Sequence, residues 1–260
     1  MKARLLLVGF CLAAVLAEAA EWNKSFTVGA NPQLRVMTDD ARIEVRAVPG
    51  NSVSAKVTTR GYNIGAADVK ITERQAGDVV EITVKIPHRT YIMNLGNQWV
   101  RIDVTAPPST RLELQADDGS LHATGFKARA NLRTSDGSVE VREHDGVLHA
   151  KTFDGAITVE GRFDDLDLAT GDGRIECSVA RGSKLAADWR VRTTDGSVEL
   201  RLPPELAADV DVSTGDGSLH FDLPVSATTK SRSGLRGRLN GGGRMLQVRT
   251  ADGSIRILRN

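Results

Sequence analysis

The feature that most constrains the fold is an Asp-Gly pair that recurs at a fixed interval. The pairs begin at Asp118, Asp136, Asp154, Asp172, Asp195, Asp216 and Asp252, at intervals of 18, 18, 18, 23, 21 and 36 residues, the last being two periods. A fixed period of this kind is typical of repeat proteins, in which each unit packs only against its neighbours. The chain therefore predicts a stack of similar units.

Apolar and polar residues alternate around each pair. With the Asp as position zero, apolar residues recur at −6, −4, +3 and +5, and Thr recurs at −2. Side chains alternate between the two faces of a strand, so these positions face inward and position +4 faces outward. The outward residues are His122, Glu140, Thr158, Glu176, Glu199, His220 and Arg256. An earlier copy spans Leu34 to Val45 with Asp40-Ala41 at the bend, and 233–235 matches a degenerate copy.

No unit can bury its apolar side alone, so the units must stack. Antiparallel hairpins would also use Asp-Gly turns, but the constant place of Thr favours parallel coiling. We therefore predict an all-β fold, a single-stranded β-helix-like β-solenoid with coils of about 18 residues. Right-handed crossovers dominate in proteins, which favours right-handed winding. Glycine at each bend is expected to supply a positive φ.

The chain divides into three predicted parts. Residues 1–19 have the basic start, apolar run and small-residue cleavage site of a signal peptide. Residues 20–111 form an all-β region with the first repeat and a hairpin around 75–78, and residues 112–260 form the solenoid repeats. We expect 46–98 to cover one end or flank of the stack, because an open end exposes unpaired backbone.

Charge and cysteine content narrow the function. The net charge of +1 argues against a nucleic-acid partner. The signal peptide predicts an exported protein, periplasmic, extracellular or on the cell surface. After cleavage we expect no segment long enough to span a bilayer. Cleavage would leave one cysteine, Cys177, at an inward position, where a buried small side chain is expected.

The repeat phrase resembles a known bacterial family. Thr-x-Asp-Gly-Ser-Val-Glu-Val, following Val-Arg-Ile-Asp-Val-Thr-Ala-Pro-Pro-Ser-Thr-Arg-Leu-Glu-Leu, is similar to the putative-adhesin family of unknown function. That family is related to the head-domain repeats of autotransporter adhesins. The resemblance covers 26–258 and implies a β-solenoid on an exported or envelope protein, with no catalytic or ligand residue to carry over.

Two carboxylate groupings are candidates for chemistry. In parallel units about 4.8 Å apart, the bend Asp residues form a row that either serves the turns or binds calcium. The outward Glu176 and Glu199 fall in neighbouring units and could act as acid and base, with arginines nearby. Those arginines are Arg174, Arg192 and Arg201. The simpler interpretation of both glutamates is a solvated face neutralised by arginine.

The remaining candidates favour structural roles. His122 and His220 share one repeat position but lie several units apart, and His144 and His149 flank a bend without a partner for zinc. Residues 241–243, three glycines, are expected to form a bend. We predict no catalytic residue, no cofactor and no metal site.

The sequence favours a non-catalytic, adhesin-like β-solenoid that binds an envelope polysaccharide or a surface protein through many weak contacts. One alternative is a carbohydrate-active β-helix enzyme, with the insertion at 181–188 overhanging Glu176 and Glu199. Another is a structural envelope protein that self-assembles end to end. Any specific binding locus is expected where the period breaks, at 46–98 and 181–188.

Overall fold

A computed structural model describes residues 19–65, 68–87 and 98–260. The predicted signal peptide lies outside these residues except for its last position, as do residues 66–67 and 88–97. Within the described part of the chain every regular element is a β-strand. That part contains no helix long and apolar enough to cross a membrane.

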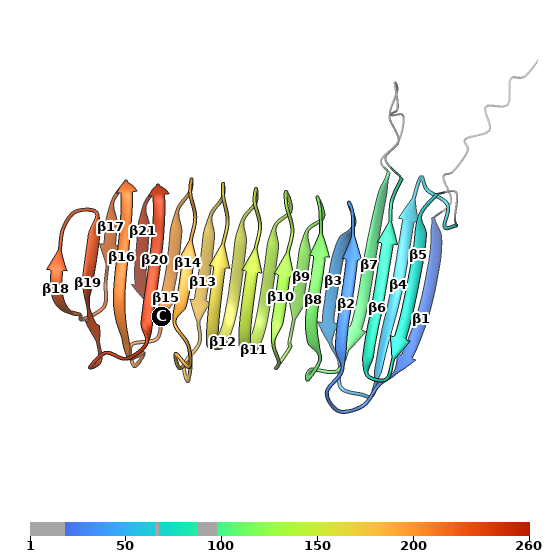
Figure 1. Cartoon of the computed structure of the whole chain (residues 1–260), viewed down its shortest axis with the longest axis horizontal. Coiled ribbons are helices and arrows are strands. Elements are labelled where there is room, and N and C mark those ends of the chain that lie inside the picture. The colour runs from blue at the N-terminus through green and yellow to red at the C-terminus, as the bar shows by residue number, and fades with distance from the viewer. Residues whose placement is uncertain (1–18, 66–67, 88–97) are drawn as a thin grey trace, which may run out of the picture.

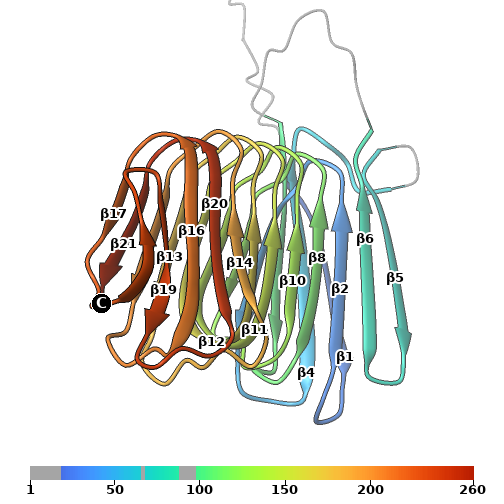
Figure 2. The same cartoon turned by 60° about the vertical axis from the view of Figure 1, so that its left-hand side comes forward.

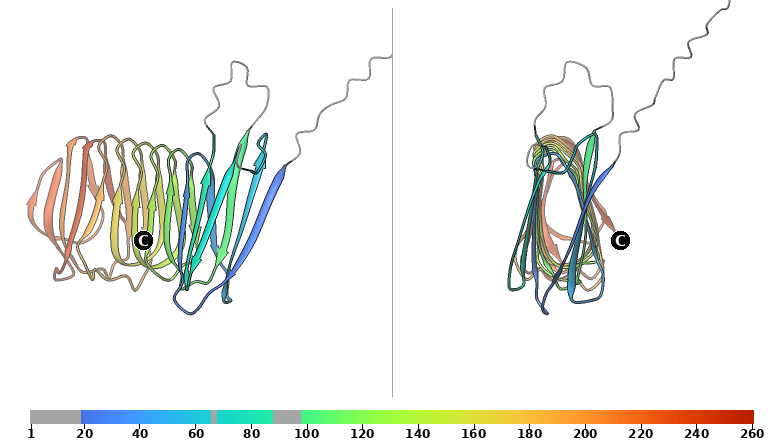
Figure 3. Two further views of the ribbon diagram at one scale, coloured as in Figure 1. Left: turned by 45° about the vertical axis from the view of Figure 1, so that its right-hand side comes forward. Right: turned by 90° about the vertical axis from the view of Figure 1, so that its right-hand side faces the viewer.

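The strands form an elongated stack of two sheets that lie face to face (Figure 1, Figure 3). One sheet holds the strands that precede the Asp-Gly bends and is called the leading sheet; the other is the trailing sheet. The leading sheet runs β5 (Lys70–Ala76), β6 (Val79–Lys85), β2 (Gln33–Thr38), β8 (Arg111–Ala116), β10 (Ala130–Arg133), the ends of β11 (Val139–Lys151) and β12 (Ile157–Ala169), β14 (Trp189–Arg192), β20 (Met245–Asp252), β16 (Ala208–Asp216), β19 (Gly234–Leu239) and β18 (Ser226–Lys230).

The trailing sheet follows the same direction along the stack. It runs β1 (Ala20–Thr27), β4 (Ser52–Arg60), β7 (Trp99–Ala106), β3 (Arg42–Ala47), β9 (Leu121–Thr124), the starts of β11 and β12, β13 (Ile175–Val179), β15 (Val198–Leu202), β21 (Ile255–Arg259) and β17 (Leu219–Phe221). Strands β11 and β12 pass round the edge opposite the Asp-Gly bends, which we call the return edge, and so belong to both sheets.

Identical repeat positions lie on top of one another, as parallel coiling predicts. Leu112, Ala130 and Leu148 pair in succession in the leading sheet, and Val139 pairs with Ile157 in the trailing sheet. All five side chains are buried in one continuous core. The expected all-β, β-solenoid-like fold is confirmed, whereas right-handed winding stays a prediction.

The order of the units in space differs from their order in the sequence at the C-terminal end (Figure 2). The last strand pair, β20–β21, lies between the pairs β14–β15 and β16–β17. Asp252 consequently bridges to Asp195 and pairs with Asp216. The degenerate repeat predicted at 233–235 is wrong, because β19 pairs antiparallel with β16 and with β18. The long interval before Asp252 reflects this hairpin.

The Thr at position −2 bonds each unit to the next. Its hydroxyl donates to the carbonyl oxygen of the bend glycine in the neighbouring unit, at 2.9 Å from Thr134 to Gly119 and 3.0 Å from Thr152 to Gly137. The same bond is made by Thr170, Thr193, Thr214 and Thr250. A polar side chain in an apolar row is thus paired, as burial requires.

The bend glycines are required by the close approach of stacked units. A methyl group at Gly155 would lie 2.4 Å from the carbonyl oxygen of Gly137, and one at Gly173 would lie 2.2 Å from that of Gly155. The expectation of positive φ is wrong for the bends at Gly119, Gly137, Gly155 and Gly173. It is correct for Gly196, Gly217 and Gly253, at 153°, 153° and 137°.

Both ends of the stack are covered by residues that cross between the sheets. At the N-terminal end, the hairpin β5–β6 forms where expected, and Nζ of Lys24 in β1 lies 2.6 Å from Oε1 of Glu73 in β5. At the C-terminal end, Leu223 is buried and Val225 partly buried in the connection from β17 to β18. These contacts shield a core that an open end would expose.

Candidate functional site

The outward residues at position +4 form a continuous row across the trailing sheet, and Asp103 and Lys56 extend this row in register at one end. We call the whole row the outer stripe. Strand register places its ten members side by side in the order Lys56, Asp103, Glu44, His122, Glu140, Thr158, Glu176, Glu199, Arg256 and His220. The seven predicted residues all belong to it. Glu44 stands at +4 of the first repeat, so the repeat pattern was sufficient to predict it as an outward residue. Asp103 and Lys56 come from strands without the repeat and carry no such signal.

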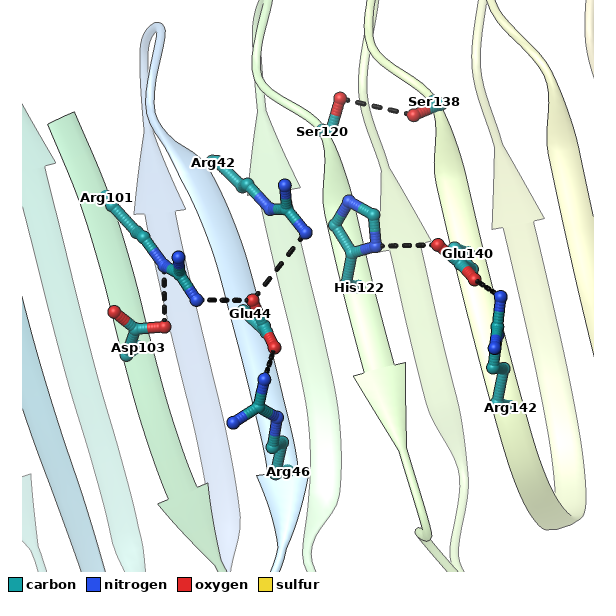
Figure 4. A network of polar contacts seen from close by, with 10 residues as sticks. All are labelled: Arg42, Glu44, Arg46, Arg101, Asp103, Ser120, His122, Ser138, Glu140 and Arg142. Atoms are coloured by element: carbon teal, nitrogen blue, oxygen red, sulfur yellow. Dashed lines mark hydrogen bonds and ion pairs between the residues drawn. The ribbon is translucent and has the colours of Figure 1, made fainter. Parts of the chain in front are cut away.

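Glu44 is surrounded by three arginines, and with Asp103 they form what we call the Glu44 cluster (Figure 4). Nη2 of Arg101 lies 2.7 Å from Oε2 of Glu44, and Nη2 of Arg42 lies 3.6 Å from the same oxygen. Arg46 pairs with Oε1. Arg101 also binds Asp103, with 2.8 Å between Nε and Oδ1. Arg42 and Arg46 reach Glu44 because residues two apart share one face of β3, and Arg101 because β7 is the neighbouring strand.

The next units of the stripe hold a histidine–carboxylate pair (Figure 4). Nδ1 of His122 lies 3.0 Å from Oε2 of Glu140, and Nη2 of Arg142 lies 2.5 Å from Oε1. Burial and the neighbouring Arg42 lower the pKa of His122. The imidazole is therefore neutral near pH 7, and Arg142 supplies the positive charge beside Glu140.

The predicted acid–base pair is adjacent but ion-paired. Glu176 and Glu199 are register partners on β13 and β15. Arg174 lies 2.7 Å from Glu176, and Arg201 lies 2.5 Å from Glu199. Arg192 was expected nearby, which is wrong: it lies on the leading sheet, where it pairs with an aspartate. Arg256 also lies 3.9 Å from Glu199, so each carboxylate is paired with at least one guanidinium, the arrangement of a solvated face.

The insertion at 181–188 does not overhang these glutamates, so that expectation is also wrong. It follows β13 at the return edge, away from the outward face of the trailing sheet. Its residues line a hollow of about 790 Å³ together with Glu205 and 242–244. A second hollow of about 310 Å³ lies between 186–188 and the leading-sheet residues His149, Asp165 and Asp167. The break in the period marks a surface hollow, but on a different part of the molecule.

A groove of about 280 Å³ adjoins the Glu44 cluster on the trailing sheet. It is lined by parts of β1, β4, β7 and β3, including Lys24, Ser25, Ser54, Lys56, Arg46 and Thr105. Its walls combine cations, carboxylates and hydroxyl groups, and Ser25 Oγ lies 2.8 Å from Ser54 Oγ. Part of this surface comes from the 46–98 segment, where a specific locus was predicted. No residue pattern in the sequence pointed to the groove itself.

The bend aspartates form the expected row, one per unit. All seven are exposed, and those at 154, 172, 195 and 252 bridge in succession through their backbones. Among the described residues, no group of three or more His, Cys, Asp or Glu side chains converges to hold a metal ion. The turns are held by backbone bonds, such as Asp154 N to Ser135 O at 2.7 Å.

The other candidates occupy structural positions. Cys177 is buried as expected, and burial raises the pKa of its thiol. His144 is also buried: its ring stacks on Phe163 at 5.9 Å, and Nε2 lies 3.1 Å from the Val147 carbonyl oxygen. The sequence placed His144 only beside a bend. Nε2 of His149 lies 3.2 Å from Asp165 on the leading sheet. Residues 241–243 connect β19 to β20 with positive φ, as a bend requires.

Fold and surface together define an all-β, β-solenoid-like repeat protein whose outward face carries a row of paired charges. The chain belongs to the Toastrack DUF4097 family, whose model matches residues 33–258. The family resemblance inferred from the repeat phrase is thereby confirmed. No curated protein matches the sequence.

Several solved structures resemble the chain. A putative adhesin from Bacteroides fragilis is 11% identical, covers 94% of this chain and 100% of its own, and has a TM-score of 0.53. A putative adhesin from Parabacteroides merdae is 13% identical, covers 92% of this chain and 96% of its own, and scores 0.45. A putative cell adhesion protein from Clostridium sporogenes is 9% identical, covers 94% and 100%, and scores 0.42. At these identities the likeness shows the fold alone.

Proposed function

We propose that the protein is a non-catalytic, exported, adhesin-like module that binds an envelope polysaccharide or a surface protein. The observation that carries this is the outer stripe, whose ten members offer donors and acceptors on successive strands of a rigid sheet. Weak contacts repeated along one surface gain strength because the first contact raises the effective concentration of the next. The similar structure described as a putative adhesin supports the same kind of role.

Export through the signal peptide 1–19 is part of this proposal, with the periplasm or the outer surface as destination. The alternative of a β-helix enzyme has less support, because Glu176 and Glu199 are each paired with an arginine. End-to-end self-assembly has less support too, because crossing residues such as Lys24 and Leu223 cover the two ends.

The test is retention of the protein on immobilised envelope fractions and glycans. We expect retention that is weakened when the stripe residues Lys56 and Arg256 are changed together to Gln. A matched variant, Arg111→Gln with Arg133→Gln on the leading sheet, should retain binding. Retention on no fraction, or loss with the leading-sheet variant alone, would contradict the proposal. Release of reducing ends from a glycan, lost in Glu176→Gln with Glu199→Gln, would instead establish the enzyme.

A further inference from the structure

The charge balance differs along the trailing sheet. On β1, β4, β7 and β3, five basic side chains face outward against three acidic ones: Lys56, Arg60, Arg101, Arg42 and Arg46 against Glu21, Asp103 and Glu44. From β11 to β15 the balance reverses, with Arg142, Arg174 and Arg201 against Glu140, Glu160, Glu176 and Glu199. The net charge of +1 for the whole chain conceals this contrast.

The Glu44 cluster leaves guanidinium donors free for a ligand. Each guanidinium has five N–H donors, whereas one carboxylate supplies one negative charge. Glu44 is shared by three arginines, lies between them and is 12% exposed (Figure 4). Arg46 remains 64% exposed and Arg42 51% exposed. Because Glu44 already orients them, little conformational entropy is lost when an anion binds.

The fork of donors on a guanidinium matches a carboxylate. Positive charge alone would also suit nucleic acid, but Glu44 and Asp103 lie within the cluster and repel duplex DNA, with one charge per about 1.7 Å, more than a polymer with one carboxylate per sugar. Sugar hydroxyl groups need acceptors as well as donors, and these carboxylates supply acceptors. The adjoining groove adds the hydroxyl groups of Ser25, Ser54 and Thr105.

An exposed aromatic ring lies on the same face. Trp99 precedes Arg101 by two residues in β7, so the two side chains point the same way. Trp99 is 41% exposed, one of four large apolar side chains that are at least 40% exposed in the described chain. An indole offers a flat apolar surface and one N–H donor. These suit a sugar ring, which is apolar on one face and polar at its rim.

We propose that the Glu44 cluster, with Trp99 and the adjoining groove, binds an acidic polysaccharide through the carboxylate groups of its sugars. The guanidinium groups of Arg42, Arg46 and Arg101 bind the carboxylates, and Glu44 is a positioning residue that holds them. This inference rests on the proposed function and deepens it by naming the ligand class and the part of the stripe that contacts it.

The test is calorimetric titration with polygalacturonate, with its methyl ester and with dextran. We expect binding to polygalacturonate alone, because only that polymer carries free carboxylates. Arg46→Gln with Arg101→Gln should weaken it about tenfold or more, the effect of losing charge-assisted bonds. The matched control is Arg174→Gln with Arg201→Gln on the central part of the sheet, which should bind like the native protein.

A second variant, Arg42→Lys with Arg46→Lys, keeps the charge and removes the fork, and we expect weaker binding to the same polymer. Equal binding to the methyl ester, equal loss in the control, or tighter binding to double-stranded DNA than to polygalacturonate would overturn the inference. The two proposals fail separately. If the Arg46→Gln, Arg101→Gln protein is still retained fully on envelope fractions, the ligand class is wrong while the binding role stands; retention on no fraction contradicts the binding role itself.

Discussion

The first unit of the stack and the regular units beyond it share one inward pattern but differ at the bend. In the regular units glycine is required and the Thr hydroxyl donates to the preceding unit. In the first unit Ala41 replaces glycine, and the buried hydroxyl of Thr38 has no hydrogen-bond partner among the described residues. The strands beyond it, β6 and β7, are joined by residues that contain no Asp-Gly pair.

This difference between the units shows what the bend glycine and the threonine at −2 contribute. Gly119 approaches the carbonyl oxygen of Ala41, so glycine is needed on the unit that stacks against an existing bend. Among the described residues no Asp-Gly bend stacks on the outer side of Ala41, which carries a methyl group at this position. Within the same residues the Thr38 hydroxyl has no bend carbonyl to which it donates. Glycine and threonine therefore serve contacts between units, and their value depends on a preceding neighbour.

The largest expected effect is at the bend glycine. Gly155→Ala places a methyl group 2.4 Å from the Gly137 carbonyl oxygen. We expect it to lower the free energy of unfolding by about 3 kcal/mol, as overpacking at a rigid site does. The counterpart Ala41→Gly removes a buried methyl group and should cost about 1–2 kcal/mol, from glycine entropy and lost burial together. Urea unfolding of both proteins measures the contrast, and equal losses would show that bends do not stack as described.

The next effect is at the threonine. Thr152→Val keeps the shape but leaves the Gly137 carbonyl without its hydroxyl donor. We expect a loss of about 1–3 kcal/mol in unfolding free energy, the cost of an unsatisfied buried acceptor. Thr38→Val removes a hydroxyl that has no partner and should leave stability unchanged or slightly higher. The same urea measurement applies, and a larger loss at Thr38 than at Thr152 would reverse the comparison.

The smallest expected effect is on the pH dependence of the unfolding free energy, because the regular units contain histidines that the first unit lacks. Burial lowers the pKa of His144, and burial together with Arg42 lowers that of His122. A His with a lowered folded-state pKa takes up its proton more readily when unfolded, so its stabilising contribution is complete above the unfolded pKa near 6.5 and is lost as the pH falls.

Unfolding free energy should therefore decrease between pH 7 and pH 5. His144→Gln keeps an N–H donor for the Val147 carbonyl and should make the decrease smaller. Denaturant titrations at the two pH values measure this slope. An identical slope in native and variant proteins would mean that His144 gains a proton in the folded core as easily as in the unfolded chain.

Much of the fold was predictable because the repeat is a local property of the chain. Alternation around each Asp-Gly pair assigned Trp189 and Cys177 to the core and Glu140 to the surface, and all three assignments are correct. The reason for glycine at four bends was not predictable, since it lies in the distance between units and not in the φ of one residue.

The candidate site was less predictable for the same physical reason. The outer stripe follows from the repeat, yet its most basic part depends on Arg101, which reaches Glu44 from 57 residues away. Strands β4 and β7 carry no repeat phrase, so nothing in their sequence states which strand they join. Arg192 was misplaced although it stands before its Asp-Gly bend, on the leading sheet, whereas Glu176 and Glu199 follow their bends on the trailing sheet.

The sequence alone was sufficient to predict the parallel stacking of like positions, which side chains face inward or outward, and the family. Those features need only the period of the repeat and the alternation of a strand. Two placements became known only from the tertiary structure: β20–β21 lies between earlier units, and 181–188 faces away from Glu176. Such placements depend on which free strand edge is available and which core surface remains uncovered, and these are long-range properties that leave no periodic trace in the chain.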